Sequence, residues 1–425
     1  MIKNFSDLAT TPNRQLALEI IEAGMIAIRT EAVIKSSVFI KDDFLHIKDL
    51  FGREEKFDLG KFKRIKVVGF GKSAPEAALA LEQVLGSRIK AGAVIGLYKV
   101  LGKYIESFAG THPRPSEANV LASKEIVKLV ENSSKDDLII AIVSGGGSSL
   151  LCYPDSECAE STKLYDAFLK SGRTISEINT VRKHLSLLKG GGLAKLAYPA
   201  TVLSLIFSDI PGDIFEAVAS GPTYQDQTTV ADAEKVIREN NLGEFNLIET
   251  PKEDKYFENV HNFVLVSNKV AVRKMAEKAE AFGLKVNIVS TDLYDEVDKA
   301  LERIFSAKGE NSAVLAAGEP RVFVTKAGGR GGRNLFMALK AIKKRALDSV
   351  FVSFASDGLD NSEVAGAIVD RNTVEKVEKL NLDVDDYLNR FDSYSFFQKA
   401  GDMIVTGPTG ANVSDLMVLL TKRNE

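Results

Sequence analysis

The chain of 425 residues is poor in the residue types that build covalent or metal-based sites, with two cysteines and four histidines. Cys152 and Cys158 cannot form a disulfide framework, and together with the scattered histidines they predict no convincing zinc site. No apolar run approaches the ~18 residues that a membrane span needs. The N-terminal residues also lack the apolar core of a secretory signal. We therefore expect a cytoplasmic protein without a membrane partner.

Neither sign of charge dominates the chain, because 55 Lys and Arg against 58 Asp and Glu give a formal net charge of −3. Such a chain lacks the broad positive field by which proteins hold nucleic acid backbones, so we expect no nucleic acid partner. Its 45% apolar and 27% charged residues are typical of an ordinary globular protein. At about 150 residues per domain, the length suggests two or three domains.

Short apolar runs that predict strands alternate with amphipathic segments that predict helices almost throughout the chain. Several of the runs lack polar alternation, as expected of strands covered on both faces. The expected strands are 65–70, 93–97, 138–143, 201–207, 263–266, 286–290 and 350–355, and the expected helices include 12–35, 116–132 and 268–283. This alternation predicts an α/β fold with a mostly parallel sheet, flanked by helices, in each domain.

The most polar interval is 238–262, which contains few apolar anchors. Domain boundaries fall in such segments, so we place the boundary near residue 245. We expect a Rossmann-like N-terminal domain over residues 1–245 and a second α/β domain over residues 246–425. The extreme C-terminal segment is expected to pack back on the first domain.

Ten of the 32 glycines fall in three short runs, 145–147, 190–192 and 328–332. Glycine lets backbone N–H groups approach an anion without a Cβ in the way. The runs are therefore candidates for ligand-binding loops.

The segment VVGFGKSA (67–74) predicts a strand, a tight turn and a helix, a geometry that forms anion sites. Its glycine spacing matches a dinucleotide fingerprint, but the next strand is followed by LYK, without an acidic residue for a ribose. Gly71-Lys72-Ser73 resembles the end of a Walker A loop, yet Lys66 stands where the first glycine is needed. A generic phosphate or carboxylate site around Lys72 and a plain glycine turn with a solvated lysine also remain open.

The segment LIIAIVSGGGSSLL (138–151) repeats the pattern of strand, glycine-rich turn and helix start. It predicts either a phosphate cradle or a structural turn. Its candidate binding residues are Ser144, Gly145, Gly146, Gly147 and Ser148.

The segment AGGRGGRNL (327–335) places Arg330 and Arg333 among four glycines, just ahead of an expected helix. It occurs once and without interleaved aromatics, unlike Gly/Arg segments that bind RNA. Arginine in this position suits a forked donor for phosphate or carboxylate. We therefore favour ligand binding, with Asn334 as a further candidate.

Three aspartates follow expected strands, where ligands bind in open α/β sheets. Asp209 follows the strand 201–207, and Asp357 and Asp360 follow the strand 350–355. Asp-Gly pairs are often only turns, but together with cationic glycine loops they suit Mg²⁺-dependent phosphoryl transfer.

The order of these motifs resembles the class II glycerate kinases, the glycerate 2-kinase family whose C-terminal part is called the MOFRL domain. The resemblance covers nearly the whole chain. It runs through GFGKSA (69–74), GTHPRPSEAN (110–119), SGGGSS (144–149), INTVRKHLSLLKGGGLA (178–194), SDIPGD with ASGPT (208–223), GGRGGRN (328–334), SDGLD (356–360) and GPTGANVSDL (407–416).

This resemblance implies two α/β domains with the active site in the cleft between them. It also implies phosphorylation of D-glycerate, at the 2-hydroxyl, by ATP with Mg²⁺ or another divalent cation. We expect a monomer or homodimer with this small molecule as its partner. The expected catalytic residues are Lys72, Arg333 and Asp209, the binding residues are Gly71, Ser73, Ser144, Gly145, Gly146, Gly147, Ser148, Arg330 and Asn334, and the metal ligands are Asp357 and Asp360.

The chain departs from the family pattern at Leu335 and Phe336, where Gln-Glu is usual, and at Gly192, where arginine is common. Two alternative functions remain. An NAD(P)H-dependent hydroxypyruvate reductase would need the acidic ribose ligand that is missing. A non-enzymatic sugar-phosphate-binding module is suggested because GKSA after a strand also resembles sugar-isomerase domains.

Overall fold

The computed structural model describes all residues except 172–174, 211, 213, 326–327, 345–347 and 422–425. The chain forms two compact units. One is continuous, Thr30–Val266, and we call it the inserted unit. The other combines Met1–Arg29 with Ser267–Glu425, and we call it the split unit.

The inserted unit is built on a six-stranded sheet in which all neighbouring strands are parallel. The spatial order is β6-β5-β4-β7-β8-β9. The strands are β4 (Arg64–Phe70), β5 (Ile89–Gly96), β6 (Glu106–Ala109), β7 (Asp137–Ser144), β8 (Thr201–Phe207) and β9 (Val260–Val266). Counted along the chain, this is the 3-2-1-4-5-6 order of the doubly wound Rossmann fold. The expected parallel sheet is confirmed in this unit.

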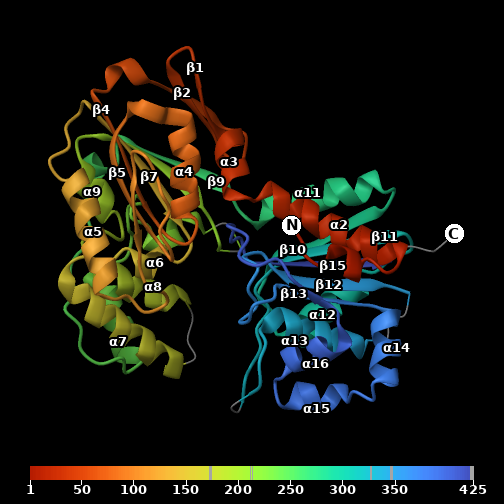
Figure 1. Cartoon of the computed structure of the whole chain (residues 1–425). Helices are drawn as coiled ribbons and strands as arrows, with labels where there is room; N and C mark the ends of the chain where they lie inside the picture. The colour runs from red at the N-terminus through yellow and green to blue at the C-terminus, as the bar shows by residue number, and fades with distance from the viewer. Residues whose placement is uncertain (172–174, 211, 213, 326–327, 345–347, 422–425) are drawn as a thin grey trace. The chain divides into compact units, whose positions relative to one another are not determined.

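Helices cover both faces of this sheet, α4 (Ala74–Leu85) on one and α5 (Glu117–Val130) with α9 (Gly192–Ala197) on the other (Figure 1). Every residue of β7 is buried, because apolar side chains on both of its faces meet a helix layer. The unit also contains α3 (Thr30–Ser37), α6 (Gly147–Leu150), α7 (Asp155–Ser171), α8 (Ile175–Lys183), α10 (Val230–Glu239), and an antiparallel sheet of β1 (Val38–Lys41), β2 (Phe44–Lys48) and β3 (Glu54–Asp58).

The split unit contains a mixed six-stranded sheet with the order β10-β11-β15-β12-β13-β14. Its strands are β10 (Lys285–Leu293), β11 (Ser312–Gly318), β12 (Val350–Ala355), β13 (Gly366–Val369), β14 (Met403–Ile404) and β15 (Asp415–Thr421). Only β10 and β11 are parallel, and the other neighbours are antiparallel. The expected mostly parallel sheet is therefore wrong for this unit. Two features explain it: β12 reaches β13 without an intervening helix, and β15 pairs between β11 and β12.

Helices also cover both faces of the split-unit sheet (Figure 1). A large apolar core joins one face to α12 (Val297–Ser306), α13 (Arg333–Ile342), α14 (Arg371–Lys379), α15 (Val384–Asn389) and α16 (Ser393–Ala400). On the other face lie α2 (Pro12–Ala27) and α11 (Asn268–Ala281), which pack closely, since a Cβ on Gly24 would lie 2.7 Å from Met275 Cγ.

The chain changes units at two places that the sequence pattern did not mark. The expected helix 12–35 is two helices, because α2 ends before Ile28 and α3 begins at Thr30 in the other unit. The polar interval 238–262 runs into β9, which hydrogen-bonds to β8, so the inserted unit continues to Val266 rather than ending near residue 245. Asp415–Thr421 forms β15 within the split-unit sheet, and residues 422–425, the extreme C-terminal segment, lie outside the described residues.

Candidate active site

The two glycine loops of the inserted unit lie at neighbouring strand ends. One follows β4 and the other follows β7, and these two strands pair in the middle of the sheet. The strand order reverses between them, because β5 lies on the other side of β4. Ligands of open α/β sheets bind at such a switch point, outside the carboxyl ends of the strands.

The loops are joined to each other by hydrogen bonds. The Lys72 N–H donates to the carbonyl oxygen of Gly145 at 2.8 Å, and the Ser73 N–H donates to Ser144 Oγ at 3.2 Å. Gly71 has a φ of +120°, and a Cβ at this position would lie 2.2 Å from Ser144 Oγ. Glycine at 71 is therefore needed both for its backbone conformation and for the close approach of the second loop.

The glycine turn after β7 offers unused backbone donors. Among the described residues, neither the N–H of Gly145 nor that of Gly146 donates to a backbone or side-chain acceptor. Gly146 adopts the left-handed conformation with a φ of +78°. Successive N–H groups beside such a residue form a concave site for an anion.

Basic side chains from separate segments gather around this turn. A Cβ on Gly146 would lie 3.1 Å from Lys72 Cγ and 3.3 Å from His112 Cδ2. Partial burial, and then the positive charges of Lys72 and Arg182, lower the pKa of His112, so its ring is neutral at pH 7 although it keeps access to solvent. Burial also lowers the pKa of Arg182, since Glu157 and Tyr165 offset it only in part.

Neither His112 nor Arg182 was among the site residues predicted from the sequence. Both stand in segments that resemble the glycerate kinases, GTHPRPSEAN and INTVRKHLSLLKGGGLA. Only the folded chain brings His112 close to Lys72 and puts the charge of Arg182 within reach of His112, because His112 follows β6 and Arg182 lies on α8.

Asp209 lies against the same turn. A Cβ on Gly145 would come within 1.9 Å of Asp209 Oδ2, so the carboxylate rests on the glycine backbone. The residue follows β8, the neighbour of β7, as expected from its place after a strand. The structure thus brings the candidate residues of the inserted unit together at the ends of three adjacent strands.

Arg333, the other candidate cation, begins helix α13 in the split unit and is held by carboxylates. Its Nε donates to Asp415 Oδ2, and its Nη2 lies 2.9 Å from Glu319 Oε1. Burial opposes the positive charge, but Asp415 and Glu319 outweigh it and raise the pKa of Arg333. Burial, supported by the negative charges of Glu319 and Asp360, raises the pKa of Asp415 to about 7 despite Arg333.

The start of α13 is fixed by Asp360. Its carboxylate accepts from the N–H groups of Asn334 at 3.1 Å and Leu335 at 2.8 Å, and from Asn334 Nδ2 at 3.2 Å. A Cβ on Gly332 would lie 2.3 Å from Asp360 Oδ1, so glycine makes room for this cap. A carboxylate is favoured here because the first N–H groups of a helix lack partners within the helix.

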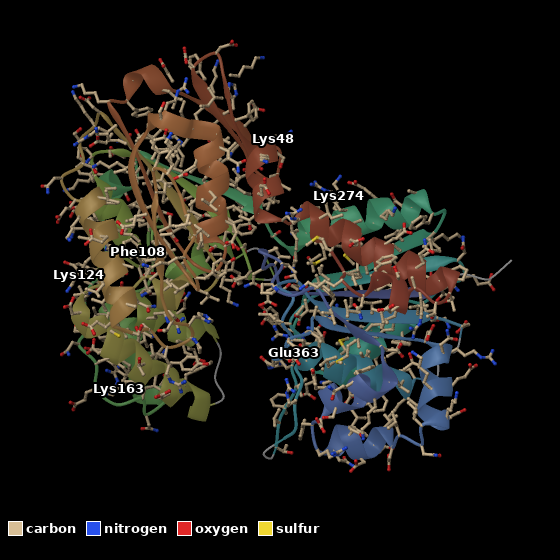
Figure 2. All side chains as sticks on the ribbon, viewed as in Figure 1. Lys48, Phe108, Lys124, Lys163, Lys274 and Glu363 are labelled. Carbon is tan, nitrogen blue, oxygen red and sulfur yellow. The ribbon has the colours of Figure 1, made fainter. Side chains whose placement is uncertain are left out.

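Arg330 is directed to a different set of partners. Its Nη2 lies 2.8 Å from Glu363 Oε2, and its guanidinium carbon lies 4.1 Å from the centre of the Tyr394 ring. Glu363, labelled in Figure 2, also accepts from the Tyr394 hydroxyl. The two arginines of one loop therefore have separate environments.

Asp357 and Asp360, the residues expected to bind a metal, both accept hydrogen bonds from N–H groups of the chain. Both oxygens of Asp360 accept N–H donors, and Asp357 Oδ1 accepts from the Leu359 N–H at 3.0 Å. In the described part of the chain, no group of three or more His, Cys, Asp or Glu side chains could hold a metal ion. We therefore derive no step through a protein-held metal.

Comparisons with known proteins agree with the motif order along the whole chain. The family model described as "Domain of unknown function (DUF4147)" matches residues 16–251, more than half of the chain, and the MOFRL family model matches residues 312–415. A glycerate 2-kinase of Pyrococcus horikoshii is 34% identical over 96% of this chain and 97% of that protein. The chain belongs to the class II glycerate kinase family.

The solved structures extend this similarity to the fold. A crystal structure of a glycerate kinase from Thermotoga maritima matches with a TM-score of 0.82 and 32% identity, covering 96% of this chain and 99% of that one. A relative from Agrobacterium vitis with the provisional name hydroxypyruvate reductase is 34% identical over 84% of this chain and 87% of its own length. The α/β class expected from the sequence is confirmed.

The departures from the glycerate kinase pattern have structural counterparts. Leu335 and Phe336 are buried in the core beneath α13, and the Phe336 ring stacks on that of Phe391 at 5.7 Å between centroids. Gly192 lies close to the backbone, since a Cβ there would meet the Leu187 carbonyl oxygen at 2.2 Å. Leu335 and Phe336 thus occupy apolar core positions of this chain, whereas the backbone around Gly192 leaves no room for a side chain.

Proposed function

We propose that the chain transfers the γ-phosphoryl group of ATP to the 2-hydroxyl of D-glycerate, giving 2-phosphoglycerate and ADP. The observation that carries this proposal is the pair of joined glycine loops with Lys72 at the switch point, in a chain similar to glycerate kinases over nearly its whole length. Mg²⁺ enters as part of the MgATP substrate. The reaction forms a bond between the substrate oxygen and the γ-phosphorus and breaks the bond to the oxygen of the β-phosphate.

The protein contributes mainly by positioning and by neutralising charge, since phosphoryl transfer needs little covalent chemistry from an enzyme. We assign anion binding to the Gly145 and Gly146 N–H groups and to Lys72. Arg333 neutralises the transferring phosphoryl group. Asp209 orients the attacking hydroxyl and accepts its proton, because its carboxylate lies on the Gly145 backbone beside these donors.

The test is incubation of the protein with MgATP and a panel of small hydroxy acids. ADP release should depend on D-glycerate, and phosphorus NMR should identify the product as the 2-phosphate rather than the 3-phosphate. NADH with hydroxypyruvate serves as the control for the reductase alternative. If ADP release depends on no hydroxy acid, while NADH is consumed with hydroxypyruvate, the kinase assignment is wrong.

We also propose that the enzyme works in the cytoplasm on small molecules, as a monomer or homodimer. In the part of the chain that the structure describes, no helix combines the length and apolar composition of a membrane span. Light scattering on the purified protein would give the mass of the particle, and a mass above that of a dimer would contradict the proposal.

A further inference from the structure

Ser148 takes part in a chain of hydrogen bonds that fixes the direction of its own hydroxyl. Its Oγ lies 2.9 Å from Ser220 Oγ, and Ser220 donates to Asn179 Oδ1 at 2.6 Å. Asn179 Nδ2 in turn donates to the Ala217 carbonyl oxygen at 3.5 Å. Because a carbonyl oxygen can only accept, this last contact orients the Asn179 amide with its oxygen toward Ser220.

The orientation of Asn179 decides which serine is the donor in the first contact. A hydroxyl has a single hydrogen, and that of Ser220 is used by Asn179. The hydrogen between the two serines must therefore come from Ser148. In the described residues Ser148 has no other side-chain partner, so its oxygen keeps lone pairs and no hydrogen for a ligand.

Two glycines of the run 190–192, to which the proposed function assigns no role, hold this chain of hydrogen bonds in place. The Gly190 N–H donates to the Ser220 carbonyl oxygen at 2.9 Å, and the Gly191 N–H donates to that of Gly221 at 2.8 Å. Ser220 is fully buried, whereas Ser148 is only half-buried. The Ser220 end of this chain of hydrogen bonds therefore lies inside the protein, whereas a ligand can reach the Ser148 end.

Ser148 stands two residues from Gly146, whose N–H and neighbouring Lys72 suit an anion. Carboxylate and phosphate oxygens cannot donate to Ser148, but a hydroxyl next to a carboxylate can. The hydroxyl that is phosphorylated must release its proton, and a chain of hydrogen bonds that ends on an amide cannot take it. Ser148 therefore suits a hydroxyl that keeps its proton.

Resting on the proposed function, we propose that Ser148 accepts a hydrogen bond from the 3-hydroxyl of D-glycerate, with Ser220 and Asn179 as positioning residues. This contact makes the enzyme select acids that carry a second hydroxyl. It also excludes Ser148 as a catalytic base.

The test compares the binding of D-glycerate with that of D-lactate, which has the same configuration and lacks only the 3-hydroxyl. Titration calorimetry of the wild-type protein should give a dissociation constant about threefold to tenfold lower for D-glycerate, the effect of one neutral hydrogen bond. Ser148→Ala should raise the dissociation constant of D-glycerate by this factor and change that of D-lactate by less than about twofold. The affinity ratio should fall to about one.

Matched variants separate this role from a structural one. Ser149→Ala removes a neighbouring hydroxyl that donates to the Pro113 carbonyl at 2.7 Å, and should leave the affinity ratio unchanged. Asn179→Ala frees the Ser220 hydrogen to turn toward Ser148 and should lower the ratio without touching substrate. Asn179→Asp keeps an accepting oxygen and should retain the ratio, even if its charge weakens both acids.

The inference would be overturned by an unchanged affinity ratio in Ser148→Ala, whether or not both acids bind more weakly. A wild-type ratio near one would do the same. Failure of the proposed function is seen separately, as wild-type protein that releases no ADP with MgATP and D-glycerate. If Ser148→Ala does not fold, the affinity ratio of Asn179→Ala tests the inference instead. This ratio comes from binding alone and does not require turnover.

Discussion

Lys72 and Arg333 are positioned in contrasting ways. The main chain fixes the loop that carries Lys72. The Lys72 N–H donates to the Gly145 carbonyl oxygen, and the missing Cβ at Gly71 lets the two loops meet. Around Arg333 charged side chains fix the geometry, since Asp415 and Glu319 bind the guanidinium and Asp360 caps the helix that begins there. The first site depends on the absence of Cβ atoms, and the second on a balance of charges.

This difference has electrostatic consequences for an anion. Near Gly146 an anion meets backbone donors, Lys72, the charge of Arg182 and one carboxylate, Asp209, whereas near Arg333 it meets one cation and three carboxylates. A buried Asp415 with a pKa of about 7 moderates that negative charge, because it is protonated in part of the molecules at neutral pH. The two sites should therefore respond differently to substitution and to pH.

The largest effect should come from Arg333. Arg333→Ala should lower turnover by about 10³–10⁵, the range for an arginine on a transferring phosphoryl group. Arg333→Lys should remain severely impaired, because one ammonium group lacks the planar fork that reaches Asp415 and Glu319 together. Turnover and thermal midpoint should be measured side by side, with the exposed Arg371→Ala as control. Turnover within about tenfold of wild type, ~1.4 kcal/mol of barrier, would refute the assignment.

Lys72→Ala should be next, with turnover lowered by about 10²–10³, as for loss of one preorganised donor. Because the loop geometry comes from the main chain, the thermal midpoint should change little. Lys124→Ala, which removes a half-buried lysine paired with Asp155, is the matched control. A large fall in thermal midpoint for Lys72→Ala would show that the side chain is structural. It would contradict the difference proposed between the Lys72 and Arg333 sites.

Gly71→Ala tests the role of the absent Cβ more directly. The new Cβ would lie 2.2 Å from Ser144 Oγ, so the loops must separate and the free energy of unfolding should fall by about 2–3 kcal/mol. Gly52→Ala is the control, because Gly52 also has a positive φ, +87°, but nothing lies within 4 Å of its Cβ position. The free energy of unfolding of Gly52→Ala should fall by only about 1 kcal/mol, the cost of backbone strain alone. Equal losses in urea unfolding would show that strain, not loop contact, matters.

The last prediction concerns the pH dependence linked to Asp415. Its pKa of about 7 in the folded chain lies above the ordinary value of ~3.9, so the folded state binds the proton more tightly. The free energy of unfolding should therefore fall as pH rises from 4 to 7, by about 1 kcal/mol per pH unit relative to Asp415→Asn. Urea unfolding of both proteins across this range checks the slope. If the difference in unfolding free energy between wild type and Asp415→Asn stays constant or grows as pH rises, the raised pKa of Asp415 is wrong.

Much of the inserted unit could be predicted from the sequence. Its strands are continuous apolar runs, and its glycine loops follow them directly, so periodicity and composition place Lys72 and Asp209 at strand ends. The family motifs add Arg333 from the other unit. These features are local, and local patterns are what a single sequence carries.

What could not be predicted depends on contacts between distant segments. The segment 415–421 is apolar like a parallel strand, and nothing in it indicates that it pairs antiparallel with both β11 and β12. For the same reason Asp415 and Glu319 gave no sign of meeting Arg333. The helix 12–35 looked continuous, because amphipathic spacing does not reveal that its two parts pack on different sheets.

The place of β15 bears on how the protein forms during synthesis. All strands of the inserted unit have been synthesised once residue 266 is made, so this unit can fold while translation continues. The split-unit sheet has β15 between β11 and β12, and cannot close until residues 415–421 are made. Helix α2, among the first residues synthesised, can pack on α11 before then, but its contacts with β15 must wait for that late strand. A ribosome-bound chain ending before residue 415 should therefore contain a finished inserted unit beside an unfinished partner, the kind of intermediate that chaperones bind.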